Sequence, residues 1–218
     1  MQKQEITLFD AVTPVAITSS TDATPIVITA TAHGLTVGQR VLIYGHTTNI
    51  AANGIFLVKA ATANTFTLGD EITNADVAGS GAGAGSSGIC MKAPPVVMAQ
   101  DFENAILQVG TSGTATATLK TAGSNGKPFT AGNTGPRYDY PNMGATVSPS
   151  NPYSFVQLIN LDTGAAVNGA TGVVVAGADI NNTYEININA LKYLTLIPIS
   201  WTAGAISAKL LLTGKSPL

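Results

Sequence analysis

Residues 25–68 read PIVITATAHGLTVGQRVLIYGHTTNIAANGIFLVKAATANTFTL. The stretch contains four short apolar runs, which are Ile26–Thr29, Val41–Tyr44, Ile55–Val58 and Thr65–Leu68. Apolar runs of this length, bounded by glycine and asparagine, are typical of β-strands rather than helices. Asn53-Gly54 supplies the positive φ angles that a tight turn needs. The stretch therefore predicts a small, complete β module.

The spacing within this stretch resembles that of a known β module. The segments that carry the resemblance are HGL-x-x-G-x-x-V-x-I-x-G at 33–45, NG-x-F-x-V at 53–58 and TF-x-L at 65–68. The matching residues are Ile28, Thr31, His33, Gly34, Leu35, Gly38, Val41, Ile43, Gly45, Asn53, Gly54, Phe56, Val58, Thr65, Phe66 and Leu68. The module is similar to one in virion proteins of tailed bacteriophages and to the β-barrel inserted near the first catalytic half of ubiquitin-activating enzymes. The resemblance covers roughly residues 25–92.

Of these two families, the phage virion proteins fit the rest of the chain better. The glycine-rich stretch 79–88 is not followed by Lys-Ser/Thr, so it lacks the pattern of a nucleotide-binding loop. Cys90 lies between apolar neighbours, where a buried and inert thiol is expected. A second pattern, from Tyr184 through Trp201 to Leu210, resembles a β-sandwich common in phage structural proteins. Together the two resemblances imply a structural protein of a virion.

The composition indicates an all-β protein with few charges. Only 10% of the residues are charged, against about 25% in an average soluble domain, and no helix-length amphipathic pattern appears. The net charge of −2 offers no attraction to nucleic acid or to an anionic membrane. The chain has no signal-peptide pattern and no apolar stretch of about 18 residues, so we expect synthesis in the host cytoplasm and no membrane partner. Such a surface suits a protein that is mostly covered by neighbours.

We expect three parts along the chain. An N-terminal arm with edge strands occupies residues 1–23, and the small β-barrel module follows at 24–93, with its glycine-rich loop at 79–88. A β-sandwich domain begins with two prolines and occupies residues 94–218, with a long loop at 121–152. The predicted fold class is therefore all-β, a small β-barrel module followed by a β-sandwich domain.

Nothing in the sequence indicates catalytic chemistry. His33 and His46 belong to turns, and no third ligand stands at the spacing of a metal site with them. Asp70, Glu71 and Asp76 could surround a calcium ion, but the alternation and the bidentate glutamate of a calcium-binding loop are missing. We therefore expect no catalytic residue, no cofactor and no metal, and a protein that is not an enzyme.

Two clusters are candidates for an interface. The first is an apolar cluster in the polar N-terminal arm, which either forms an edge strand of its own domain or docks on another subunit. The second lies in the long loop and combines tyrosine with arginine, residue types enriched at interface hot spots, unless it only covers the edge of the sandwich. The residues are Ile6, Leu8 and Phe9 in the arm and Arg137, Tyr138 and Tyr140 in the loop.

The expected function is that of a non-enzymatic virion protein that decorates or cements a phage capsid. Its expected partners are the major capsid protein or neighbouring virion proteins, together with further copies of itself, and a trimer is the first expectation. The alternative is a tail-fibre, collar or baseplate module that contacts the host surface or neighbouring tail proteins. If the arm serves only as an interface, deleting residues 1–10 leaves both β domains folded.

Overall fold

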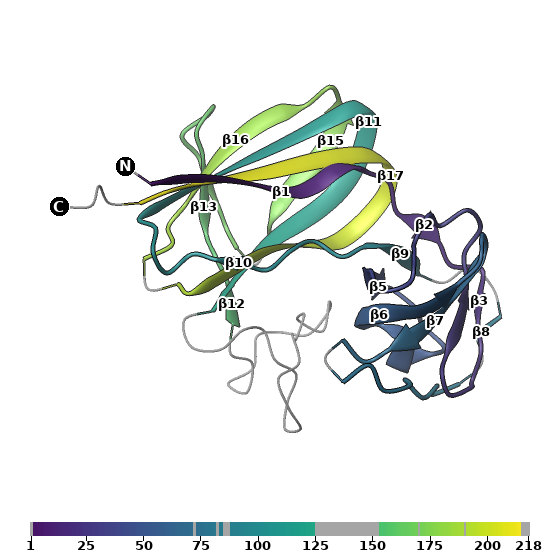
Figure 1. Cartoon of the computed structure of the whole chain (residues 1–218). Helices are drawn as coiled ribbons and strands as arrows, with labels where there is room; N and C mark the ends of the chain where they lie inside the picture. The colour runs from purple at the N-terminus through teal and green to yellow at the C-terminus, as the bar shows by residue number, and fades with distance from the viewer. Residues whose placement is uncertain are drawn as a thin grey trace. The chain divides into compact units, whose positions relative to one another are not determined.

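The structure, a computed structural model, is built almost entirely of β-strands (Figure 1). It describes residues 2–71, 73–81, 83–84, 88–124, 153–169, 171–189 and 191–214. Among these residues the only helical element is a single 3-10 turn, η1 (Ile50–Ala52). The prediction of an all-β fold is confirmed.

The described residues form two compact units, and one is inserted into the other. Residues 14–93 form the inserted unit, whereas residues 2–13, 94–124 and 153–214 form what we call the split unit. The chain passes between the units at residues 93–94, where the two prolines stand in the sequence. The first strand belongs to the split unit, so residues 1–23 do not form one separate arm.

The inserted unit is a single antiparallel sheet with the strand order β2-β9-β5-β6-β7-β4-β3-β8. The strands are β2 (Val15–Ala16), β3 (Ser19–Ser20), β4 (Val27–Thr29), β5 (Arg40–Tyr44), β6 (Gly54–Ala61), β7 (Thr65–Gly69), β8 (Gly83–Ala84) and β9 (Ile89–Lys92). The four apolar runs of residues 25–68 correspond to β4, β5, β6 and β7. Alternate side chains of these strands meet in one core, which contains Ile17, Ile26, Ile28, Ala30, Leu35, Val41, Ile43, Ala52, Val58, Phe66, Leu68 and Cys90.

Part of the predicted glycine-rich loop is held by hydrogen bonds. The Gly79 N–H donates to the Ala23 carbonyl oxygen at 3.0 Å, and the Gly81 N–H donates to Asp22 Oδ1 at 2.9 Å. Farther along, Gly83–Ala84 forms β8 and pairs with β3. Composition alone predicted a loop over the whole of residues 79–88, because it does not reveal these partners.

The split unit contains a nine-stranded antiparallel sheet with the main order β1-β17-β11-β16-β13-β14. In addition, β10 pairs with β17, whereas β12 and β15 pair with β11. The strands are β1 (Lys3–Val12), β10 (Val97–Met98), β11 (Asn104–Ser124), β12 (Tyr153–Phe155), β13 (Leu158–Asn160), β14 (Ala166–Val167), β15 (Val173–Ala178), β16 (Asn181–Ile186) and β17 (Tyr193–Thr213). Residues 121–124 of the long loop expected at 121–152 belong to β11 instead, and residues 125–152 lie outside the described residues.

A long, curved ribbon of β11 and β17 organises the split unit (Figure 1). The two strands pair from Asn104 opposite Thr213 to Ser124 opposite Tyr193, with register shifts between Ser112 and Leu119. The first half of β11 also pairs with β16 and the second half with β15. The two consecutive strands β15 and β16 therefore follow the ribbon around its bend. The bend brings the two halves of the sheet face to face, and their inner side chains form the core.

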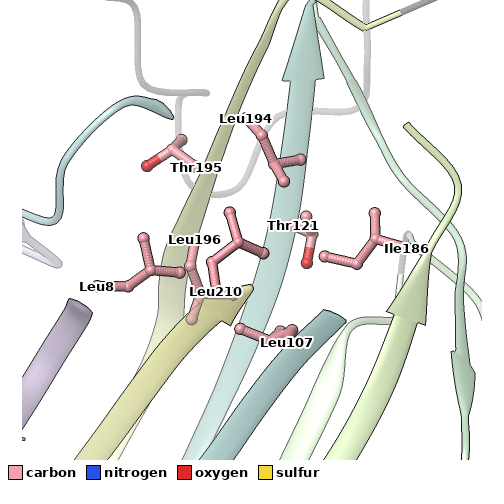
Figure 2. A pocket seen from close by; sticks show the side chains of 8 residues that line it. All are labelled: Leu8, Leu107, Thr121, Ile186, Leu194, Thr195, Leu196 and Leu210. Carbon is pink, nitrogen blue, oxygen red and sulfur yellow. The ribbon is translucent and has the colours of Figure 1, made fainter. Parts of the chain in front are cut away.

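The two halves meet at a small gap that is too narrow to hold a water molecule (Figure 2). Leu8, Leu107, Ile186 and Leu210 line it from the first half of the sheet, and Thr121, Leu194, Thr195 and Leu196 line it from the second. Most of the lining is apolar, so the gap is a packing defect of the core rather than a place for a ligand.

Candidate functional site

The N-terminal cluster lies in β1, the edge strand that pairs with β17. A register shift between Thr7 and Phe9 forms a β-bulge, which turns both Leu8 and Phe9 towards the core, where they are 7% and 2% exposed. The Phe9 ring packs edge-on against Trp201 with 5.8 Å between ring centroids. Of the two alternatives for the arm, the edge strand is therefore the one observed. This corrects the hypothesis that Leu8 and Phe9 contact another subunit; Ile6 is half-buried.

The second predicted cluster, Arg137, Tyr138 and Tyr140, lies outside the described residues. Its role as an interface stays a prediction.

His33 is a structural residue of the turn that precedes β5. Its Nδ1 accepts a hydrogen bond from the Leu35 N–H at 3.0 Å, and its Nε2 lies 3.3 Å from the Thr65 carbonyl oxygen. The ring also packs edge-on against Phe66, with centroids 4.9 Å apart. These contacts join the turn to β7, which agrees with the assignment of His33 to a turn.

His46 takes part in a buried polar cluster centred on Asn49, whose side chain is fully buried. The Asn49 N–H donates to His46 Nδ1 at 3.3 Å, and Asn49 Nδ2 donates to Ser20 Oγ at 3.2 Å and to the Thr21 carbonyl oxygen at 2.9 Å. Asn49 Oδ1 accepts from the N–H and the hydroxyl of Ser80 at 3.0 and 3.2 Å. Burial lowers the pKa of His46. The cluster joins three segments of the inserted unit, and the sequence did not single out Asn49, because an asparagine in a polar loop carries no signal of burial.

The three carboxylates of the possible calcium site have separate protein partners. Glu71 pairs with Arg40, Asp76 pairs with Lys59, and Asp70 Oδ1 accepts hydrogen bonds from the N–H and the hydroxyl of Thr73, both at 2.9 Å. Burial raises the pKa of Glu71, and the neighbouring Arg40 partly opposes that shift. The described part of the chain contains no group of three or more histidine, cysteine or acidic residues that could hold a metal ion.

Cys90 is buried in the core of the inserted unit, at 1% exposure. Burial raises the pKa of its thiol to about 12, because the apolar core disfavours the thiolate. A thiol that stays protonated at neutral pH is a poor nucleophile, so this side chain serves packing.

The surface feature that the sequence did not reveal is the outer face of one half of the split unit. Strand pairing aligns two rows of side chains across β13, β16, β11, β17 and β1, and alternate residues of the same strands are buried on the other side. One row is Ile159, Glu185, Ile106, Leu211 and Glu5, and the other is Leu161, Thr183, Gln108, Lys209 and Thr7. We call these two rows the outer face.

The outer face combines apolar side chains with few charges. Ile159 and Leu161 are 43% and 46% exposed, and Ile106 and Leu211 are half-buried neighbours on adjacent strands. Lys209 Nζ donates to Glu5 Oε1 at 2.9 Å, which pairs these two charges with each other. Glu185 lies between Ile159 and Ile106 and has no ion-pair partner among the described residues. The alternation within each strand was visible in the sequence, but the neighbours across strands were not.

The described residues contain no helix long and apolar enough to cross a membrane. Comparison of the chain with models of protein families, with curated proteins and with solved structures found no match.

Proposed function

We propose that the protein is a non-enzymatic structural component of a tailed-phage virion, which decorates or cements the capsid. The observation that carries the proposal is the outer face, where apolar side chains from several strands are exposed or half-buried in the described part of the chain. The resemblance of residues 25–92 to a module of phage virion proteins and the charged fraction of 10% support the same function. The histidines and the carboxylates of the possible calcium site bind other groups of the protein, and the cysteine packs in a core, so each has a structural role.

The physical basis of the proposed function is burial of apolar surface on assembly. Each Å² of apolar surface removed from water contributes about 25 cal/mol before the entropic costs of association. Few surface charges mean little repulsion between neighbouring subunits on a crowded lattice. The proposal includes association of the protein with itself, with a trimer as the first expectation, and the major capsid protein or another virion protein as partner.

The test is co-sedimentation of the purified protein with phage heads assembled without it, beside sedimentation velocity of the protein alone. The expected result is saturable binding to heads and an oligomer in solution. Binding to tails, to host cells or to surface glycans, with no binding to heads, would replace the capsid role with that of a tail or baseplate module. Binding to none of these would overturn the virion proposal.

A further inference from the structure

We infer that the outer face of the split unit is the docking surface for a neighbouring protein that presents apolar side chains around a lysine or an arginine. The inference rests on the proposed virion function and names the surface and the chemistry of the partner. It concerns Leu161, just after β13, and the residues of β13, β16, β11 and β17 that face away from the core.

The geometry groups the apolar residues of this face into two pairs on either side of β16. Neighbouring strands lie about 4.8 Å apart, so Ile106 and Leu211 are adjacent on β11 and β17, and Ile159 lies two strands from Ile106, with Glu185 between them. Leu161 follows Ile159 on the same side of the chain, and its N–H donates to the Thr183 carbonyl oxygen at 2.8 Å, which fixes it in line with the sheet. Apolar side chains that gather on one face of a sheet are typical of a protein–protein interface, whereas single exposed apolar residues are common on any surface.

The charge of the face selects the partner. Glu185 stands in the apolar row between Ile159 and Ile106, so docking would remove its carboxylate from water. A buried carboxylate is costly unless it meets a cation, and the partner must therefore supply one. Lys209 is already paired with Glu5, so the same face of a second copy does not offer an uncommitted lysine at its centre. Phosphate-rich partners such as nucleic acid or an anionic membrane would be repelled by Glu185.

The chain offers a matched control for this surface. Val174 in β15 is 59% exposed, more than Ile159 or Leu161, but it lies on the other half of the sheet. Its neighbours across the strands are Thr118 and then Ser200, so it is a single apolar residue in a polar row. An aspartate placed there changes the net charge as much as one placed at Ile159, without touching the outer face.

The experiment measures binding of Ile159→Asp, Leu161→Asp, Glu185→Lys and Val174→Asp to whichever virion particle binds the unchanged protein. We expect each of the first three substitutions to weaken binding by at least about tenfold, because each places a charge against an apolar or like-charged partner surface. Val174→Asp should bind as the unchanged protein does. Circular dichroism and thermal unfolding of each variant check that the fold is retained. We expect it to be, because these side chains are exposed.

The outcomes separate the two proposals. If the unchanged protein binds a particle and the three variants bind equally well, the docking surface is overturned and the virion function stands. If the unchanged protein binds no virion component, the proposed function fails and the docking surface fails with it. If Ile159→Asp disrupts the oligomer in sedimentation velocity but leaves particle binding intact, a second copy occupies the face and the basic partner is overturned.

Discussion

At the scale of single residues, Thr121 is a polar group that the core does not accommodate. It is 2% exposed, and its hydroxyl has no hydrogen-bond partner among the described residues. A buried hydroxyl without a partner costs about 1–3 kcal/mol, and valine has nearly the same shape without that cost. Thr121→Val is therefore expected to raise the free energy of unfolding by about 1 kcal/mol, measured by urea denaturation.

Thr195 provides the control for this prediction. It lines the same gap and is equally buried, but its hydroxyl donates to the Pro95 carbonyl oxygen at 3.0 Å. Thr195→Val is expected to lower the free energy of unfolding by about 1 kcal/mol, because the carbonyl loses its donor. Equal effects of the two substitutions would show that the hydrogen bond does not distinguish them.

His46 makes the stability of the inserted unit depend on pH. Burial lowers its pKa below the ordinary value of 6.5, so the unfolded chain binds a proton that the folded protein does not. The stabilising contribution is complete above pH 6.5 and is lost as the pH falls from there through the lowered pKa. In addition, a proton on Nδ1 would remove the acceptor of the Asn49 N–H.

The test compares the unchanged protein with His46→Asn, whose side-chain oxygen can replace Nδ1 as the acceptor. Urea denaturation at pH 7 and pH 5 is expected to show a larger loss of stability at pH 5 in the unchanged protein than in the variant. Carboxylates such as Glu71 titrate in both proteins, so the difference between them isolates the histidine. An identical pH dependence in the two proteins would contradict the role of His46.

At the scale of elements, the bend of the β11–β17 ribbon requires glycine at one position. Gly204 has a φ of +80°, and a Cβ added there would lie 2.3 Å from the Thr114 carbonyl oxygen and 2.5 Å from the Ala115 Cα. Gly113, on the other strand of the ribbon, has a φ of +74° but open space around the position of its Cβ. The two glycines therefore separate the cost of the left-handed backbone from the cost of a steric clash.

Alanine at each position tests this distinction. Gly113→Ala is expected to cost about 1–2 kcal/mol, which is the cost of a left-handed conformation for a residue with a Cβ. Gly204→Ala is expected to cost clearly more, because the backbone of β11 must also move away. Thermal unfolding of both variants measures the difference, and a smaller effect at Gly204 would mean that the ribbon bends without this close approach.

At the scale of the whole molecule, the insertion makes the N-terminal strand essential to a unit whose other described residues are 94–124 and 153–214. Deleting residues 1–10 removes the buried Leu8 and Phe9 and uncovers the edge of β17. We therefore expect the truncation to unfold the split unit, in contrast to the expectation from sequence that both domains stay folded.

A single substitution in β1 tests the contribution of this strand to the stability of the split unit without removing the strand. Phe9→Ala is expected to lower the free energy of unfolding by about 3–5 kcal/mol, the usual cost of removing a buried aromatic ring from a core. Thr7→Ala, on the exposed side of the same strand, is expected to change it by less than about 0.5 kcal/mol. Denaturant unfolding of both variants provides the comparison, and a small effect of Phe9→Ala would mean that β1 is dispensable for the fold.

The sequence by itself determined the strands of the module and the all-β class. The apolar runs between residues 25 and 68 became β4 to β7, because alternation, β-branched residues and turn residues act over a few neighbouring positions. Two prolines at 94–95 interrupt the strand pattern, and the chain passes between the two units there.

Only the tertiary structure decided which distant strands pair. Glu5 and Lys209 meet across 204 positions of sequence, and the pairing of β1 with β17 makes the N-terminal cluster part of a core instead of an exposed arm. The burial of Asn49 and the alignment of Ile159, Glu185 and Ile106 on one surface likewise depend on partners far along the chain. Such pairings are set by the packing of whole sheets, since alternation tells which side of a strand is apolar but not which strand lies beside it.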